Sequence, residues 1–193
     1  MNRLVLLNVF LAVFIFITCS NIINSSMEIN APIEVETSVD IINQKILFEV
    51  EYINYAWGWM HYGRYIDNSG KLYSYSYLNI NYEDRWNPQR TGIYTESELF
   101  EKFNHSKEFV KQISYNELIQ MANLIPAASK GKLSDPVSVM WDAGLLTYKG
   151  YLYNGSKNEY IEVILRVSGD DFFENLSPEA KIIADWLMAV TKK

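Results

Sequence analysis

Cysteine is almost absent from this chain, since Cys19 is the single one in the sequence. No disulfide can form within one molecule, so any folded domain must be held by its own apolar core. The sequence also lacks a basic patch: 17 Lys and Arg stand against 23 Asp and Glu, a net charge of −6. Because nucleic-acid phosphates require clustered positive charge, we expect no nucleic-acid partner.

Motifs of catalysis and cofactor binding are missing as well. The chain contains neither the G-x-S-x-G elbow of serine hydrolases nor the G-x-x-x-x-G-K-S/T phosphate loop. Asp170, Asp171 and Glu174 offer oxygen ligands of the kind that calcium prefers. Their order matches no EF-hand loop and is typical of turns and helix caps. The sequence therefore predicts no catalytic residue, no metal site and no cofactor.

The start of the chain has the layout of a secretory signal. Arg3 precedes an apolar run over residues 4–18, shorter than the roughly 20 residues that a membrane-spanning helix needs. The segment Phe16-Ile17-Thr18-Cys19 resembles the lipobox of bacterial lipoproteins, although Phe16 and Thr18 depart from its commonest residues. The resemblance implies a lipid on Cys19, cleavage before it, and an extracytoplasmic location on a bacterial membrane. Secretion without lipid and an uncleaved anchor helix are the alternatives.

The segment after Cys19 is polar and contains Pro32, a composition typical of a tether. We therefore predict a signal peptide over residues 1–18, a tether over residues 19–31 and a single domain over residues 32–193. The first strand of that domain is expected at about residues 33–39.

Aromatic side chains are concentrated in residues 46–82, where apolar and aromatic residues favour strands. The segment Asp67-Asn68-Ser69-Gly70 predicts a hairpin turn within this stretch. A second hairpin is predicted for residues 146–153 and 159–167, joined by the turn that begins Asn154-Gly155.

Helices are expected where capping residues precede apolar stripes. Thr95 with Glu98, and Ser114 with Glu117, are capping boxes, and Ser177 followed by proline opens a last helix. Residues 137–142 are ambiguous: Asp135-Pro136 and Gly144 favour a short helix, whereas Val137, Val139 and Trp141 alternate as they would in a strand. We expect the helix. The predicted fold is α+β: an antiparallel sheet built on two hairpins, with about three to four helices packed against it.

Gly63 to Gly70, taken together with Gly169-Asp170 and the segment from Ala184 to Leu187, resembles small secreted or lipoprotein domains of low-GC bacteria. The matching positions are turn residues and residues of secondary-structure elements, and none of them forms a catalytic motif. The resemblance therefore implies no activity.

Alternation divides the aromatic side chains between two faces of the first hairpin. Trp57, Trp59 and His61 lie in one row, for which burial is the default. Three tyrosines form a row on the partner strand, and tyrosine suits a surface that is apolar at one end and wet at the other. The register across the turn is left open. The candidate binding residues are Trp57, Trp59, His61, Tyr73, Tyr75 and Tyr77.

His61 is the histidine with apolar neighbours, a setting that can shift a pKa. Since no carboxylate lies close to it in the sequence, the pattern favours a packing residue over a catalytic one.

Three functions fit these observations. We favour a non-enzymatic, envelope-anchored domain that binds a protein or glycan through the aromatic hairpin and is held at the membrane by its lipid. An envelope hydrolase that uses His61 with an acidic residue is the second hypothesis. A purely structural lipoprotein is the third.

Overall fold

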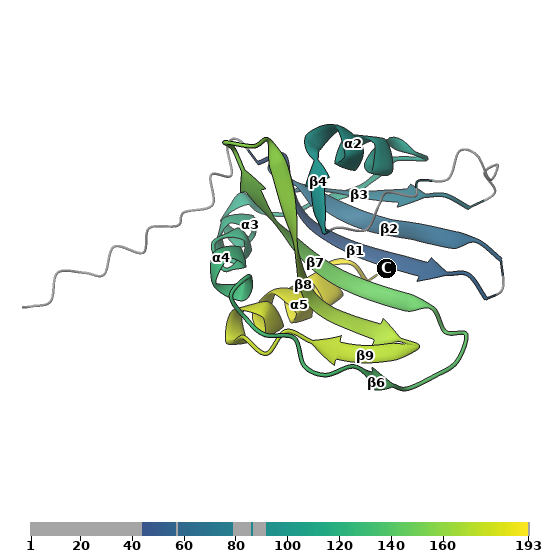
Figure 1. The fold of residues 1–193 in the computed structure, drawn as a ribbon. Helices are drawn as coiled ribbons and strands as arrows, with labels where there is room; N and C mark the ends of the chain where they lie inside the picture. The colour runs from purple at the N-terminus through teal and green to yellow at the C-terminus, as the bar shows by residue number, and fades with distance from the viewer. Residues whose placement is uncertain (1–43, 57, 79–85, 87–91, 193) are drawn as a thin grey trace, which may run out of the picture. The chain divides into compact units, whose positions relative to one another are not determined.

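The computed structural model describes residues 44–56, 58–78, 86 and 92–192 (Figure 1). The predicted signal peptide, the tether, the strand at residues 33–39, Cys19 and Trp57 lie outside the described residues.

A nine-stranded sheet forms the centre of the domain, with the order β5-β3-β2-β1-β7-β8-β9-β6, and β4 pairs with β8 off this path. Its strands are β1 (Ile46–Asn54), β2 (Met60–Asp67), β3 (Lys71–Ser76), β4 (Ile93–Thr95), β5 (Glu108–Gln112), β6 (Val137–Ser138), β7 (Leu145–Asn154), β8 (Glu159–Gly169) and β9 (Asp171–Glu174). Its helices are α2 (Glu96–Asn104), α3 (Tyr115–Ala122), the short α4 (Ile125–Ala128) and α5 (Pro178–Val190).

The α+β class is confirmed, but the sheet is larger than two hairpins. Both predicted hairpins, β2–β3 and β7–β8, are present, and β1 pairs antiparallel with β2 on one side and with β7 on the other. Short strands then extend the sheet beyond the hairpins, and they are too short to show an alternating pattern in the sequence.

The helices cover the two faces of the sheet unequally. In Figure 1, α2 and β4 lie in front of the sheet, while α3, α4 and α5 lie behind it. The rear core is mostly aliphatic and includes Leu118 of α3, Ile125 of α4 and Ile183 of α5. The front core is aromatic and includes Tyr65, Tyr75 and Phe103.

The β2–β3 turn has the predicted chemistry. The Asp67 carboxylate accepts hydrogen bonds from the amides of Ser69 and Lys71, both at 2.9 Å, and Gly70 has a φ of 79°. The resulting register places Tyr65 opposite Tyr73. His61, Tyr65 and the three tyrosines of the partner row therefore share the front face.

Residues 137–142 do not form the predicted helix. Val137 and Ser138 instead pair with Phe172 and Asp171 of β9, so the alternation of Val137 and Val139 was the decisive signal. The backbone pairing with β9, which is distant in sequence, outweighed the helix-boundary signals of Pro136 and Gly144.

Candidate functional site

Two glutamates lie on β1 among apolar neighbours. Glu49 and Glu51 alternate with Phe48 and Val50, so both carboxylates point to the front face. Both side chains are buried. A buried carboxylate without a partner is costly, so each requires positive groups from neighbouring elements.

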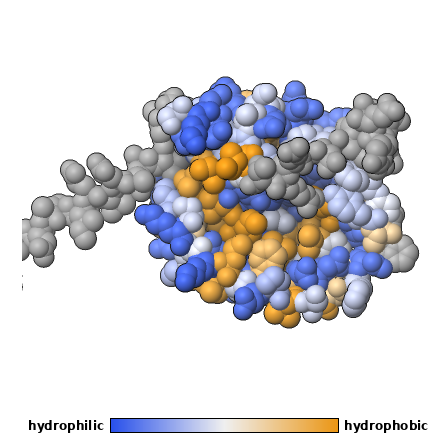
Figure 2. All heavy atoms as spheres, viewed as in Figure 1, coloured by the Kyte–Doolittle hydropathy of each residue, from blue (hydrophilic) through white to orange (hydrophobic). Residues whose placement is uncertain are grey.

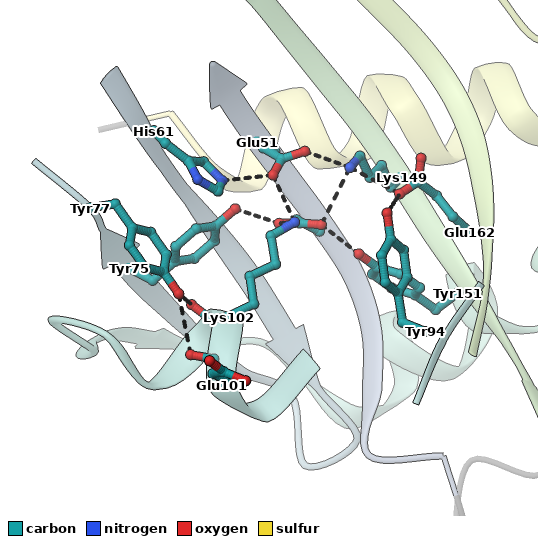
Figure 3. A network of polar contacts seen from close by, with 11 residues as sticks. Glu51, His61, Tyr75, Tyr77, Tyr94, Glu101, Lys102, Lys149, Tyr151 and Glu162 are labelled. Atoms are coloured by element: carbon teal, nitrogen blue, oxygen red, sulfur yellow. Dashed lines mark hydrogen bonds and ion pairs between the residues drawn. The ribbon is translucent and has the colours of Figure 1, made fainter. Parts of the chain in front are cut away.

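Two lysines supply these positive groups from different elements (Figure 3). Nζ of Lys102, on α2, lies 2.6 Å from Oε1 of Glu49 and 2.7 Å from Oε1 of Glu51. Nζ of Lys149, on β7, lies 2.5 Å from Oε2 of Glu51 and 3.0 Å from Oε2 of Glu162 on β8. The five residues form a single ionic cluster that joins α2 to three strands of the sheet.

Tyrosine hydroxyls complete the coordination of Glu49. Tyr75 donates a hydrogen bond to Oε1, and Tyr151 donates one to Oε2 at 2.5 Å. The Tyr75 ring occupies the space that Gly63 leaves open, since a Cβ on Gly63 would lie 2.6 Å from the Tyr75 hydroxyl. The Glu49 carboxylate is therefore fully engaged by donors, and it acts as a structural anchor.

His61 lies at the edge of the cluster, with its Nε2 2.8 Å from Oε1 of Glu51. Its ring stacks on Tyr77 at a centroid distance of 5.0 Å and is buried. The expectation that no carboxylate orients His61 is thus wrong. The partner comes from β1, ten positions earlier in the chain, and reaches His61 through the β1–β2 pairing.

The ionic state of the cluster follows from its contacts. Burial alone would raise the pKa of Glu51, but Lys102, Lys149 and the hydrogen bond with His61 together hold this pKa well below its usual value. Burial alone would lower the pKa of Lys149, but the Glu51, Glu49 and Glu162 carboxylates hold it well above its usual value. Both groups are charged at neutral pH.

Tyr75 and Tyr151 differ from Glu51 and Lys149, because burial and the neighbouring carboxylates both favour the neutral form of a phenol. Burial first, and then the Glu49 carboxylate, raises the pKa of each phenol well above its usual value. Both hydroxyls are therefore permanent hydrogen-bond donors to Glu49 near neutral pH.

A pocket of about 370 Å³ opens above this cluster on the front face of the sheet. The polar part of its lining includes Glu51, His61, Thr147, Lys149 and Glu162. The aromatic part includes Tyr55, Trp86 and Tyr94. Figure 2 shows apolar surface gathered on this face, over β7 and β8. The pocket thus combines aromatic walls with a charged floor.

Glu162 and Tyr94 connect the floor of the pocket to its wall (Figure 3). The Tyr94 hydroxyl lies 3.4 Å from Oε2 of Glu162, the same oxygen that contacts Lys149. The Glu162 side chain is 12% exposed, so it is the carboxylate of the cluster most open to the pocket. Trp86 lies over Lys102, with its ring centroid 4.6 Å from Nζ.

The tyrosine row proposed as a contact surface is largely core. Tyr75 is 1% exposed and Tyr77 is 3% exposed, and the Tyr77 hydroxyl donates to the carbonyl of Lys102 at 2.9 Å. The hydroxyls of Tyr75 and Tyr77 therefore both have partners inside the domain. Tyr73 is half-buried, with Nζ of Lys107 4.1 Å from its ring centroid. Trp59 is also half-buried and precedes β2.

The ionic cluster was missed at the level of sequence, although it left two signals there. Glu49 and Glu51 interrupt an apolar strand on one face, and Lys149 does the same between Tyr148 and Gly150. Charged residues at core positions of two separate strands predict that the strands pair. Lys102 carries no comparable signal, because a lysine in the last turn of a helix usually serves the helix end.

Within the described ranges, no group of three or more His, Cys, Asp or Glu side chains is placed to hold a metal ion. The same part of the chain contains no helix that is long and apolar enough to cross a membrane.

Comparisons with protein-family models, with curated proteins and with solved structures found no match for this chain.

Proposed function

We propose that this chain is an envelope-anchored binding domain that holds a short, uncharged glycan in the front pocket. The observation that carries the proposal is the pocket itself, whose lining combines the aromatic rings of Tyr55, Trp86 and Tyr94 with the carboxylate of Glu162. Its volume of about 370 Å³ is at the small end of the range for ligand sites, roughly 300 to 1,000 Å³. A ligand of this kind places an apolar face on the rings and its hydroxyls on the floor.

The charges of the floor favour a hydrogen-bond donor over an anion. Three carboxylates, those of Glu49, Glu51 and Glu162, face the two ammonium groups of Lys102 and Lys149. The side-chain contacts of Glu162 with Lys149 and Tyr94 both use Oε2, so Oε1 is the atom we assign to a ligand hydroxyl. An anionic ligand would meet the surplus carboxylate and be repelled.

The lipobox-like segment at Cys19 supports the location of this activity. A lipid there would hold the domain at the outer side of a bacterial membrane, where envelope glycans are within reach. Two lipid signals, or one lipid and a second contact, are needed for stable anchoring of many proteins.

The hydrolase hypothesis also gains a specific observation, the 2.8 Å pair between His61 and Glu51 on the pocket lining. Such a pair orients an imidazole as a general base. Glu51, however, is already bound by Lys102 and Lys149, which lower its basicity and fix its position. We therefore favour binding over turnover.

Titration of the full chain with short oligosaccharides of N-acetylglucosamine and of glucose, followed by tryptophan fluorescence and calorimetry, tests the proposal. We expect saturable binding that Glu162→Gln weakens about tenfold or more, equivalent to about 1.4 kcal/mol. Glu159→Gln is the matched control, because Glu159 lies on the same strand outside the pocket lining and should leave binding unchanged.

Three results would separate the hypotheses. Binding without sugar cleavage, sensitive to Glu162→Gln, supports the proposal. Release of shorter sugars that is lost in His61→Gln would favour the hydrolase. No binding to any of these sugars by a folded chain would overturn the glycan proposal and leave the structural role.

A further inference from the structure

Apolar side chains that do not line the front pocket are exposed along the sheet edge formed by β6 and β9. Trp141 is 93% exposed, and Val137, Val139 and Met140 are each more than half exposed. Phe172, which pairs with Val137, and Leu176 extend this surface. We call these six residues the apolar edge. Figure 2 shows apolar surface at the lower rim of the molecule, where Figure 1 places β6.

The backbone of the apolar edge is held in place by hydrogen bonds. The amide of Val139 donates to the carbonyl of Asp170 at 2.9 Å, and the amide of Ala143 donates to the Asp170 carboxylate at 2.7 Å. The Ser138 hydroxyl donates to the Asp171 carboxylate, also at 2.9 Å. The exposed side chains are therefore presented outward by a fixed scaffold, not by a frayed loop.

Carboxylates outnumber basic groups around the apolar edge: Asp135, Asp142, Asp170 and Asp171 lie within or beside it, and Lys130 and Lys132 precede it. An anionic partner would therefore be repelled at this surface, and its six apolar side chains favour a partner that is bound by apolar contact. Neutral phospholipid headgroups over acyl chains meet that requirement, and tryptophan is enriched at this boundary because its ring is apolar and its N–H is polar.

The shape of the surface also favours a bilayer. The apolar edge is a projecting rim and forms no part of either described pocket. A flat lipid surface receives a projecting rim, whereas a peptide or a small molecule is usually received by a groove.

A long tether does not fix which face of the domain meets the membrane. If Cys19 carries a lipid, the 25 residue steps from Cys19 to Gln44 can span up to about 90 Å when extended. Such a tether lets any face of the domain meet the membrane, so the most apolar exposed face would decide which one does.

We propose that the apolar edge is a membrane-contact surface, with Trp141 and Met140 inserted at the boundary between headgroups and acyl chains. The proposal rests on the lipid anchor of the proposed function and not on glycan binding, so loss of glycan binding leaves it standing. Contact at this edge would supply the second membrane attachment beside the lipid.

The test uses the full, lipidated chain reconstituted into phosphatidylcholine vesicles with and without brominated phosphatidylcholine, which quenches tryptophan in contact with acyl chains. We expect bromine to quench wild-type emission, and we expect Trp141→Phe to remove most of that quenching. Because Trp141 is almost fully exposed, its replacement should leave the thermal melt unchanged, and the melt is recorded to confirm this.

The matched control moves the reporter to another exposed position. Tyr115→Trp, made in the Trp141→Phe background, places a tryptophan at the start of α3, where Tyr115 is also exposed. We expect bromine not to quench this reporter. Three results would each overturn the proposal. Bromine could quench wild type and Trp141→Phe equally, or it could quench the α3 reporter as strongly as Trp141. Aqueous iodide could also quench Trp141 as strongly on vesicles as in solution without vesicles.

Discussion

Gly63 leaves an opening in β2 that the Tyr75 ring fills, and a methyl group there has no space. A Cβ at this position would lie 2.5 Å from the Val50 carbonyl oxygen and 2.6 Å from the Tyr75 hydroxyl. We expect Gly63→Ala to lower the free energy of unfolding by about 1 to 3 kcal/mol, as overpacking does. Urea denaturation measures this loss. Gly155→Ala is the control, since its nearest contact would be an ordinary 3.5 Å.

Tyr75 and Tyr73 share a strand face but differ in burial. The Tyr75 hydroxyl donates to the buried Glu49 carboxylate, while Tyr73 is half-buried. We expect Tyr75→Phe to cost about 1.5 to 3 kcal/mol, the range for a hydrogen bond to a charged group, and Tyr73→Phe to cost much less. Thermal and urea unfolding of both variants test this. Equal losses would show that the bond to Glu49 contributes little.

At the scale of elements, α2 is attached to the sheet through a lysine as well as through apolar packing. Nζ of Lys102 is buried between Glu49 and Glu51, and Leu99 and Phe103 pack beside it. Lys102→Met would leave two buried carboxylates short of a positive partner, so we expect a loss of about 3 to 5 kcal/mol. The exposed Lys111 on β5 provides the control, Lys111→Met. A loss no larger than that of the control would contradict this role.

Elements with local signals were predictable from sequence. The Asp67–Gly70 and Asn154-Gly155 turns define both central hairpins, and the Thr95, Ser114 and Ser177 caps open α2, α3 and α5. Strands β4, β5, β6 and β9 were not predicted. Each has two to five residues, so its conformation is set by the neighbouring strand and not by its own pattern.

For the whole molecule, the ionic cluster predicts stability that falls at both ends of the pH scale. The pKa of Glu51 is lowered in the folded state, so its contribution is present above its ordinary value of 4.5 and is lost as the pH falls below it. The pKa of Lys149 is raised, so its contribution is present below 10.5 and is lost as the pH rises above that value. The pKa values of Tyr75 and Tyr151 are also raised, so their contributions to stability are present below pH 10.0 and are lost as the pH rises above it.

Urea unfolding at a series of pH values measures this profile. We expect a plateau through neutral pH and a decline on each side, with a shallower alkaline decline in Lys149→Met than in wild type. Stability that continues to rise from pH 9 to pH 11 would contradict the assigned charge states.

The sequence by itself determined the α+β class, the two central hairpins, the capped helices and the expectation of an exported, lipid-bearing chain. Those features depend on short-range rules: turn residues, caps and the length of an apolar run. The tertiary structure alone decided that Glu49 and Glu51 meet Lys102 and Lys149, that Glu51 orients His61, and that Tyr75 is core. Those contacts join residues 10 to about 100 positions apart, and their energies depend on burial and strand register, which are properties of the folded sheet.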